Sequence, residues 1–232
     1  MTSGYLEFQY EVLDDFERNY GLVQLGPMSS FTYNDDPKRL CFVLSRYKFV
    51  AKIFNGYSSV LEVGCGDAFG SRLVRQHVDS MTVSDMDSRM IDSISARPIP
   101  ARFSLSTHVW DPVTDKNPFR QRFDGVFALD VLEHVPSDVE HRFLRRLLEP
   151  LAKTGTLVLG MPSIESQVYA SPASKAGHIN CKTQEDLVSF CRNYFDCVFA
   201  FSMNDEVVHT GYSRMANYIF VVCSMKKEND EF

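Results

Sequence analysis

Apolar side chains recur every three or four positions over residues 40–54, which is the period of an amphipathic helix. After this segment, short and continuously apolar runs alternate with further segments of helical period. The short runs are predicted to be strands, at residues 59–63, 81–84, 101–105, 124–129 and 156–160. The segments between and after them are predicted to be helices, at residues 70–77, 88–96, 138–151 and 183–193. This alternation is typical of an open parallel sheet with helices on both faces.

Two further β-rich runs, at residues 195–202 and 216–224, close the chain, and no helical period separates them. They are predicted to form an antiparallel hairpin at one end of the sheet. Residues 1–39 are rich in acidic and aromatic side chains, and we expect a helical extension that packs on the main domain or acts as a lid over a ligand site. The predicted organisation is this extension, one α/β domain at 40–225 and a flexible tail at 226–232.

The composition is that of a globular protein, since 44% of the 232 residues are hydrophobic and 23% are charged. The 24 basic and 30 acidic residues give a net charge of −6, which argues against a general nucleic-acid binder. We also expect no membrane span and no secretory signal, because no apolar run has the length or position of either. The six cysteines form no Cys-x-x-Cys pair, so we expect free thiols, no zinc ribbon and a cytoplasmic location.

A glycine-rich turn follows the first predicted strand. Residues 62–66 read acid-x-Gly-x-Gly, with Glu62, Gly64 and Gly66 in the key positions. Ligands of open α/β sheets bind outside the carboxyl ends of such strands. A nicotinamide dinucleotide fingerprint would place glycine or alanine where this chain has Phe69. The Glu62 carboxylate would also repel a pyrophosphate, whereas it suits a ligand that carries positive charge.

Four features, in order along the chain, resemble the class I S-adenosylmethionine-dependent methyltransferases. The first is the turn at residues 62–66, and the second is Asp85, an acid that ends the second predicted strand, with Asp87 as the alternative. The third is the run at 123–135, which ends in Val-Leu-Glu-His-Val as in methyltransferases of ubiquinone-biosynthesis type. The fourth is the turn at 147–159 into the fifth strand, in which the family's usual Pro-Gly-Gly is altered.

This resemblance implies a Rossmann-like, seven-stranded, mostly parallel sheet with a C-terminal antiparallel hairpin and S-adenosylmethionine (SAM) as the cofactor. It implies methyl transfer to an oxygen or nitrogen of a small molecule, such as a sugar, a metabolite or a natural product. The alternatives are a catalytically silent SAM-binding partner or regulatory subunit, and a nicotinamide-dependent enzyme on a related sheet. We expect a small-molecule acceptor as partner, with no nucleic acid and no membrane, and a homodimer stays open.

The resemblance also implies which residues hold the cofactor. Asp85 would bind the two ribose hydroxyls, His108 or its neighbour would contact the adenine, and Arg46 is a candidate for the cofactor carboxylate. The complete set of expected cofactor-binding residues is Arg46, Glu62, Gly64, Cys65, Gly66, Asp85, Met86, His108, Val109, Leu129 and Asp130.

Three histidines are the candidates for chemistry on the acceptor side. His134 follows the fourth predicted strand, His178 lies in the long loop at 161–182, and His209 lies between the last two strands. We expect them to converge at the substrate edge, with His178 or His209 as general base, since imidazole titrates near neutral pH, and with His134 structural or supporting the cofactor. A divalent ion on these histidines is the alternative, but no His-x-x-x-His pair supports it, and no metal is predicted.

Overall fold

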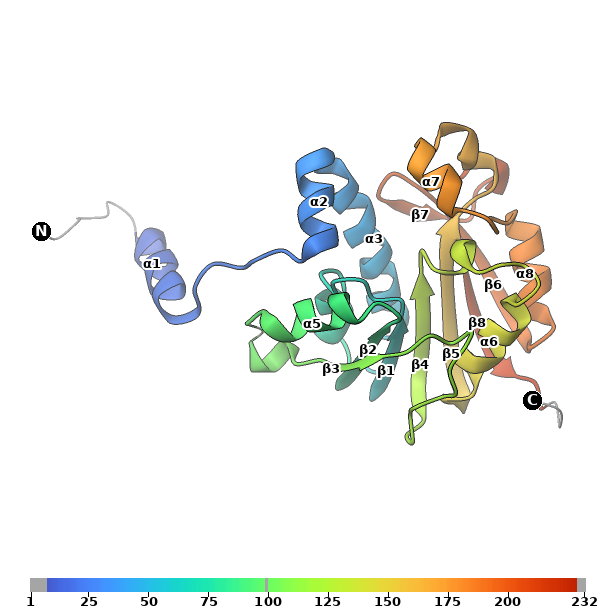
Figure 1. Cartoon of the computed structure of the whole chain (residues 1–232), viewed down its shortest axis with the longest axis horizontal. Coiled ribbons are helices and arrows are strands. Elements are labelled where there is room, and N and C mark those ends of the chain that lie inside the picture. The colour runs from blue at the N-terminus through green and yellow to red at the C-terminus, as the bar shows by residue number, and fades with distance from the viewer. Residues whose placement is uncertain (1–7, 99, 229–232) are drawn as a thin grey trace, which may run out of the picture.

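The structure is a computed structural model that describes residues 8–98 and 100–228. Its centre is an eight-stranded sheet in the order β3-β2-β1-β4-β5-β8-β6-β7 (Figure 1). The strands are β1 (Ser59–Val63), β2 (Ser80–Asp85), β3 (Ser106–Val109), β4 (Phe123–Leu129), β5 (Leu151–Pro162), β6 (Phe195–Asn204), β7 (Val207–His209) and β8 (Tyr218–Lys226). The α-helices are α1 (Phe8–Tyr20), α2 (Pro27–Asp35), α3 (Lys38–Ile53), α4 (Ser71–Arg75), α5 (Ser88–Ala96), α6 (Glu140–Leu148), α7 (Pro172–Gly177) and α8 (Gln184–Arg192).

The strand directions bring the carboxyl ends of the central strands to one edge. Strands β3, β2, β1, β4 and β5 pair in parallel, whereas β8 is antiparallel to both β5 and β6. Strand β6 therefore runs in the same direction as β5, and the segment after it returns to the edge at which β1, β2, β4 and β5 end. The strand order reverses between β1 and β4, which is where ligands bind in sheets of this kind. The predicted α/β class and antiparallel C-terminal strands are confirmed.

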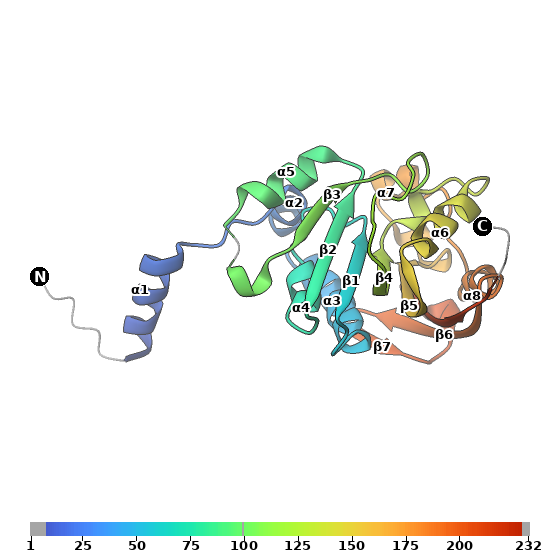
Figure 2. The same ribbon diagram turned by 90° about the horizontal axis from the view of Figure 1, so that it is seen from below.

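Helices cover both faces of the sheet (Figure 2). One apolar cluster packs between helices and sheet on each face. On one face, Val50 of α3 and Phe54 directly after it pack with Val74 of α4 and Phe127 of β4. On the other face, the apolar stripe of α6 packs with Leu187 and Phe190 of α8. Each large apolar side chain that is fully buried in this way stabilises the fold by roughly 1.5–3 kcal/mol. The helical periods read from the sequence correspond to these buried stripes.

Some predicted elements differ from the structure. The third strand, expected at 101–105, is wrong: Ala101–Phe103 forms a 3₁₀ turn and the strand begins at Ser106. β3 is a mostly exposed edge strand, so it carries no continuous apolar run that would mark its position. The sheet has eight strands rather than seven, because β7 pairs with the end of β6. Helix α7 lies in the segment expected to be loop.

The N-terminal extension consists of two helices with different surroundings. Helix α1 stands apart from the sheet in both views, and Leu13, Phe16 and Tyr20 on it are exposed (Figures 1 and 2). Helix α2 packs instead on the turn after β1, where the backbone N–H and hydroxyl of Ser29 donate to Asp67 at 2.7 and 3.0 Å. Residues 1–7 of the expected extension and 229–232 of the expected tail lie outside the described residues. The three-part organisation stays a prediction.

Candidate active site

The turn after β1 requires glycine at two positions. Gly64 and Gly66 have φ of +76° and +53°, a region that costs other L-residues roughly 1–2 kcal/mol. A Cβ at Gly64 would lie 2.3 Å from Cγ2 of Val131. The N–H groups of Gly64 and Cys65 both donate to the carbonyl of Ser84, at 2.8 and 3.0 Å. The turn is therefore held against the end of β2, and its backbone can come close to a ligand.

Asp85 presents a carboxylate beside this turn. Its Oδ2 accepts from the N–H of Gly66 at 2.8 Å, and its Oδ1 accepts from the N–H of Asp87 at 2.9 Å. A carboxylate has about four lone-pair positions, so two remain for the hydroxyls of a ligand. Val109 pairs with Asp85 in the sheet, and the side chains of Val109 and Met86 are both exposed. These apolar surfaces suit a flat ring next to the hydroxyls.

His108 lies away from this group. It pairs with Ser84 rather than with Asp85, and successive side chains of a strand point to opposite faces. Its ring packs edge-on against Phe119 at a centroid distance of 5.0 Å. Val109, and not His108, is therefore the strand neighbour of Asp85.

Glu62 is buried behind the turn rather than open to a ligand. The hydroxyls of Tyr47 and Ser71 each donate to its carboxylate at 2.5 Å, which ties α3 and α4 to β1. Burial raises the pKa of Glu62 to about 7, against the two hydrogen bonds that lower it. Burial likewise raises the pKa of the neighbouring Cys65 thiol far above its usual range, so this thiol is not reactive.

Replacing Glu62 with glutamine is expected to remove a pH dependence of folding. Because the pKa is raised in the folded state, the contribution of Glu62 to stability is fully present below about pH 4.5 and is lost as the pH rises through 7. The loss approaches about 3 kcal/mol at pH 8. Urea unfolding at pH 5 and pH 8 measures it, with exposed Glu185→Gln as the control. Equal pH dependence in Glu62→Gln and wild type would contradict the assignment.

Arg46 and Asp130 form an ion pair at the carboxyl end of β4. Nη1 of Arg46 lies 2.8 and 2.7 Å from the two carboxylate oxygens, and the guanidinium lies 3.9 Å from the ring centroid of Tyr218. Burial alone would lower the pKa of Arg46, but the Asp130 carboxylate raises it overall. Nε of Arg46 is buried and has no hydrogen-bond partner among the described residues. Leu129, the residue before Asp130, is buried and ends β4.

Two of the three candidate histidines meet at this edge. The rings of His134 and His178 lie 5.2 Å apart between centroids. His209 instead satisfies both ring nitrogens within its own hairpin: Nδ1 accepts from the N–H of Gly211 and Nε2 lies 2.9 Å from Oδ1 of Asn204. The predicted convergence therefore holds for His134 and His178, and His209 has no free lone pair in this arrangement.

Glu133 belongs to the run at 123–135 but is not among the site residues predicted from the sequence. It is fully buried beside His134, and with His134 and His178 it could hold a metal ion. The signal available in the sequence was an acid directly before a histidine and three residues after Asp130, at the end of a strand.

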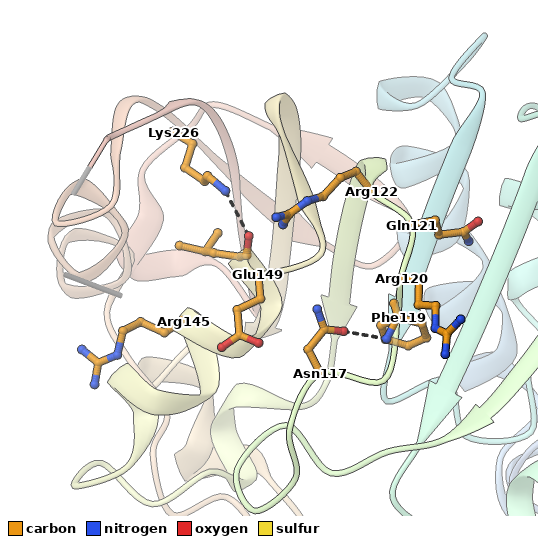
Figure 3. Close-up of a pocket in the computed structure, with 9 residues that line it drawn as sticks. Asn117, Phe119, Arg120, Gln121, Arg122, Arg145, Glu149 and Lys226 are labelled. Atoms are coloured by element: carbon orange, nitrogen blue, oxygen red, sulfur yellow. Dashed lines mark hydrogen bonds between the residues drawn. The ribbon is translucent and has the colours of Figure 1, made fainter. Parts of the chain in front are cut away.

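A cavity of about 420 Å³ lies elsewhere (Figure 3). It is lined by Asn117 and residues 119–122 before β4, by Arg145, Leu148 and Glu149 before β5, and by Lys226 at the end of antiparallel β8. The ammonium of Lys226 donates to the carbonyl of Leu148 at 3.0 Å. All of these segments are at the amino ends of the parallel strands, so this cavity is at the edge opposite the glycine turn and does not belong to the candidate site.

The arrangement fits the cofactor that the sequence resemblance implies. The turn at Gly64 has no room for a Cβ, Asp85 keeps acceptor positions for two ribose hydroxyls, and Arg46 keeps an unpartnered donor near the end of β4. No helix among the described residues is both long enough and apolar enough to span a membrane.

Comparisons with known proteins agree with this geometry. Residues 34–194 match a family model described as a methyltransferase domain. The fold resembles that of the N-methyltransferase NodS from Bradyrhizobium japonicum in complex with S-adenosylhomocysteine (SAH), at 17% identity and a TM-score of 0.59, over 91% of this chain and 96% of that one. It also resembles the plantazolicin methyltransferase BpumL in complex with SAH, at 12% identity and a TM-score of 0.62, over 94% and 99%.

A third similar structure is a DhpI–SAM–HEP complex, at 14% identity and a TM-score of 0.59, over 96% of this chain and 99% of that one. A search among curated proteins gave no match. The family match spans more than half of the chain, and its residues include the glycine turn, Asp85 and Asp130. The chain therefore belongs to the methyltransferase-domain family and is a class I SAM-dependent methyltransferase.

Proposed function

We propose that this methyltransferase transfers the methyl group of SAM to an oxygen or nitrogen of a small molecule. SAM supplies a methyl group on a positively charged sulfur, which is already a good leaving group. The remaining task of the chain is to align an acceptor with that methyl group and to exclude competing contacts. The observation that carries the proposal is that His134, after β4, and His178, in the segment after β5, lie against each other at the edge of the sheet that holds the glycine turn.

The cofactor side of the site is proposed from residues that lie together. Gly64 and Gly66 would receive the cofactor along their backbone, and Asp85 would accept from both ribose hydroxyls. Met86 and Val109 would cover the adenine ring. Arg46, held in place by Asp130, would face the methionine end through its unpartnered Nε.

The acceptor side is proposed from the loops after β4 and β5. His134 follows β4, and His178 ends α7 in the segment after β5. An isolated bridge between Ser163 and Lys182 brings the two ends of this segment together, and we propose that the segment caps the acceptor. Such a cap supports a small acceptor over a long polymer, as does the net charge of −6.

Replacing Asp85 with asparagine is expected to weaken binding of SAM and SAH by 10- to 100-fold. Hydrogen bonds to a charged acceptor contribute about 1.5–3 kcal/mol each, and the amide turns one acceptor oxygen into a donor. Calorimetric titration with SAH measures the loss. Asp87→Asn is the matched control, because Asp87 caps α5 two residues away and asparagine caps equally well. Equal affinities in the two variants would contradict the role of Asp85.

Turnover distinguishes an enzyme from the silent-subunit alternative. The purified protein is incubated with SAM and a panel of small hydroxyl and amine compounds, and SAH release is measured. Release that depends on one compound supports the proposal. SAM binding without release from any compound, together with a second chain that co-purifies, would favour the regulatory subunit.

A further inference from the structure

Glu133 is a buried acid whose carboxylate has no hydrogen-bond partner in the part of the chain that the structure describes. Its side chain is fully buried, and both carboxylate oxygens lack a hydrogen-bond donor among the described residues. A buried polar group in this condition costs free energy, and in native structures it usually has a partner such as a water or an ion. Glu133 therefore indicates that something that attracts carboxylate oxygen belongs next to it.

The two neighbouring histidines are held in one tautomer. Nδ1 of His134 lies 2.9 Å from the carbonyl oxygen of Gly177, and Nδ1 of His178 lies 2.9 Å from Oε1 of Gln167. Both partners are oxygens that can only accept, so both Nδ1 atoms carry the proton. The amide of Gln167 is oriented by its own Nε2, which donates to the carbonyl of Ser163 at 3.1 Å. Each imidazole therefore keeps a lone pair on Nε2.

This is the hydrogen-bonding pattern of metal-ligating histidines, which donate the other ring N–H to a carbonyl or carboxylate. Ligating atoms of Glu133, His134 and His178 lie within 4.8 Å of one another.

We propose that Glu133, His134 and His178 bind one divalent transition-metal ion at the acceptor side of the site. Two imidazole nitrogens and one carboxylate oxygen suit Mn²⁺, Fe²⁺, Co²⁺ or Zn²⁺ better than Mg²⁺ or Ca²⁺, which prefer oxygen alone. Three protein ligands leave open positions for an acceptor. A search for closely spaced ligands in the sequence could not detect this cluster, because its residues come from two separate loops.

The role of the ion rests on the proposed function, whereas metal binding itself does not. A bound cation lowers the pKa of a hydroxyl, as it does for water. The acceptor hydroxyl would give its proton to water, its oxygen would bond to the methyl carbon, and the electron pair of the broken carbon–sulfur bond would stay on sulfur. The ion thus favours an oxygen acceptor, since a neutral amine attacks without losing a proton first.

The test is a metal titration of the intact protein after treatment with a chelator. Binding of Mn²⁺ and Zn²⁺ is measured by calorimetry, and free Mn²⁺ is followed by electron paramagnetic resonance. We expect one site in the wild type, and affinities at least 10-fold lower in Glu133→Gln and in His178→Ala. Gln167→Ala removes the hydrogen-bond partner of His178 together with a donor to the Ser163 carbonyl, and it leaves all three ligands in place. It is expected to weaken metal binding by about 10-fold.

His77→Ala is the matched control, since its imidazole bonds Asn55 before β1 at the opposite edge of the sheet. Its metal affinity is expected to equal that of the wild type. Thermal unfolding identifies any variant that fails to fold. If Glu133→Gln fails to fold, Gln167→Ala still tests the proposal. No binding by the wild type, or equal binding in all variants, would overturn the proposal.

A parallel SAH titration separates this inference from the proposed function. Normal SAH binding with no metal binding would overturn the metal site and leave the methyltransferase proposal intact. Metal binding at these three residues without turnover of any acceptor would support the metal site and contradict the proposed function. Loss of turnover on chelation and its return with Mn²⁺ would support both.

Discussion

Replacing Gly64 with alanine is expected to abolish measurable binding of SAM and SAH and to lower the free energy of unfolding by about 2–5 kcal/mol. Two effects add: the φ of +76° is strained for alanine by roughly 1–2 kcal/mol, and the new Cβ would lie 2.3 Å from Cγ2 of Val131, an overlap that typically costs about 1–3 kcal/mol. Relief of the overlap would shift the turn that receives the cofactor. Urea unfolding and calorimetric titration with SAH measure the two changes.

Gly56→Ala is the control for backbone strain alone. Gly56 has a φ of +85°, but a Cβ there would meet nothing within 4 Å, and the residue precedes β1 at the amino edge of the sheet. We expect a loss of about 1–2 kcal/mol in stability with unchanged affinity for SAH. Equal SAH affinity in the Gly64 and Gly56 variants would show that the turn is not the cofactor site.

Replacing Arg46 with methionine is expected to destabilise the fold by about 2–3 kcal/mol. Removing one partner of a buried ion pair typically costs about 3–5 kcal/mol, and the value here is lower because 37% of the Asp130 side chain is exposed. The loss includes the cation–π contact with Tyr218. SAH affinity is expected to fall as well, since Arg46 is the proposed donor at the methionine end. Urea unfolding and SAH titration measure the effects.

A double-mutant cycle separates the pair from packing. Asp130→Asn keeps a residue that tolerates the φ of +57° at this position and removes only the charge. The double variant is expected to recover part of the stability lost in Arg46→Met, because no charge is then left unpaired. Arg46→Lys would keep the charge but lose the planar contact on Tyr218. Strictly additive effects would mean that the two side chains do not interact.

The parts of the fold that follow a local rule were predictable. Helical and strand periods identified α3, α5, α8 and the central strands, because each buries its apolar stripe in a regular way. β3 was misplaced since an edge strand with exposed side chains has no such stripe. β7 and α7 were missed because both are short and partly exposed, so neither leaves a periodic signal.

The candidate site was also predictable only where it follows a local rule of sequence. Glu62, Gly64 and Asp85 were predicted from the sequence, but only the structure showed that Glu62 is buried between Tyr47 and Ser71. His134, His178 and His209 were predicted to converge, but only His134 and His178 lie against each other, and His209 bonds within its own hairpin. The direction of a side chain in a long loop depends on how that loop packs, which no residue period encodes.

The sequence by itself determined the α/β class, the glycine turn after β1 and the acid at the end of β2. These depend on neighbouring residues: apolar period, backbone conformation and the position of a strand end. The tertiary structure decided that Arg46 pairs with Asp130 across a separation of 84 residues, and that Glu133, His134 and His178 form one cluster. Such contacts require a defined strand order and loop path, because only these bring residues that are distant in the chain within bonding distance.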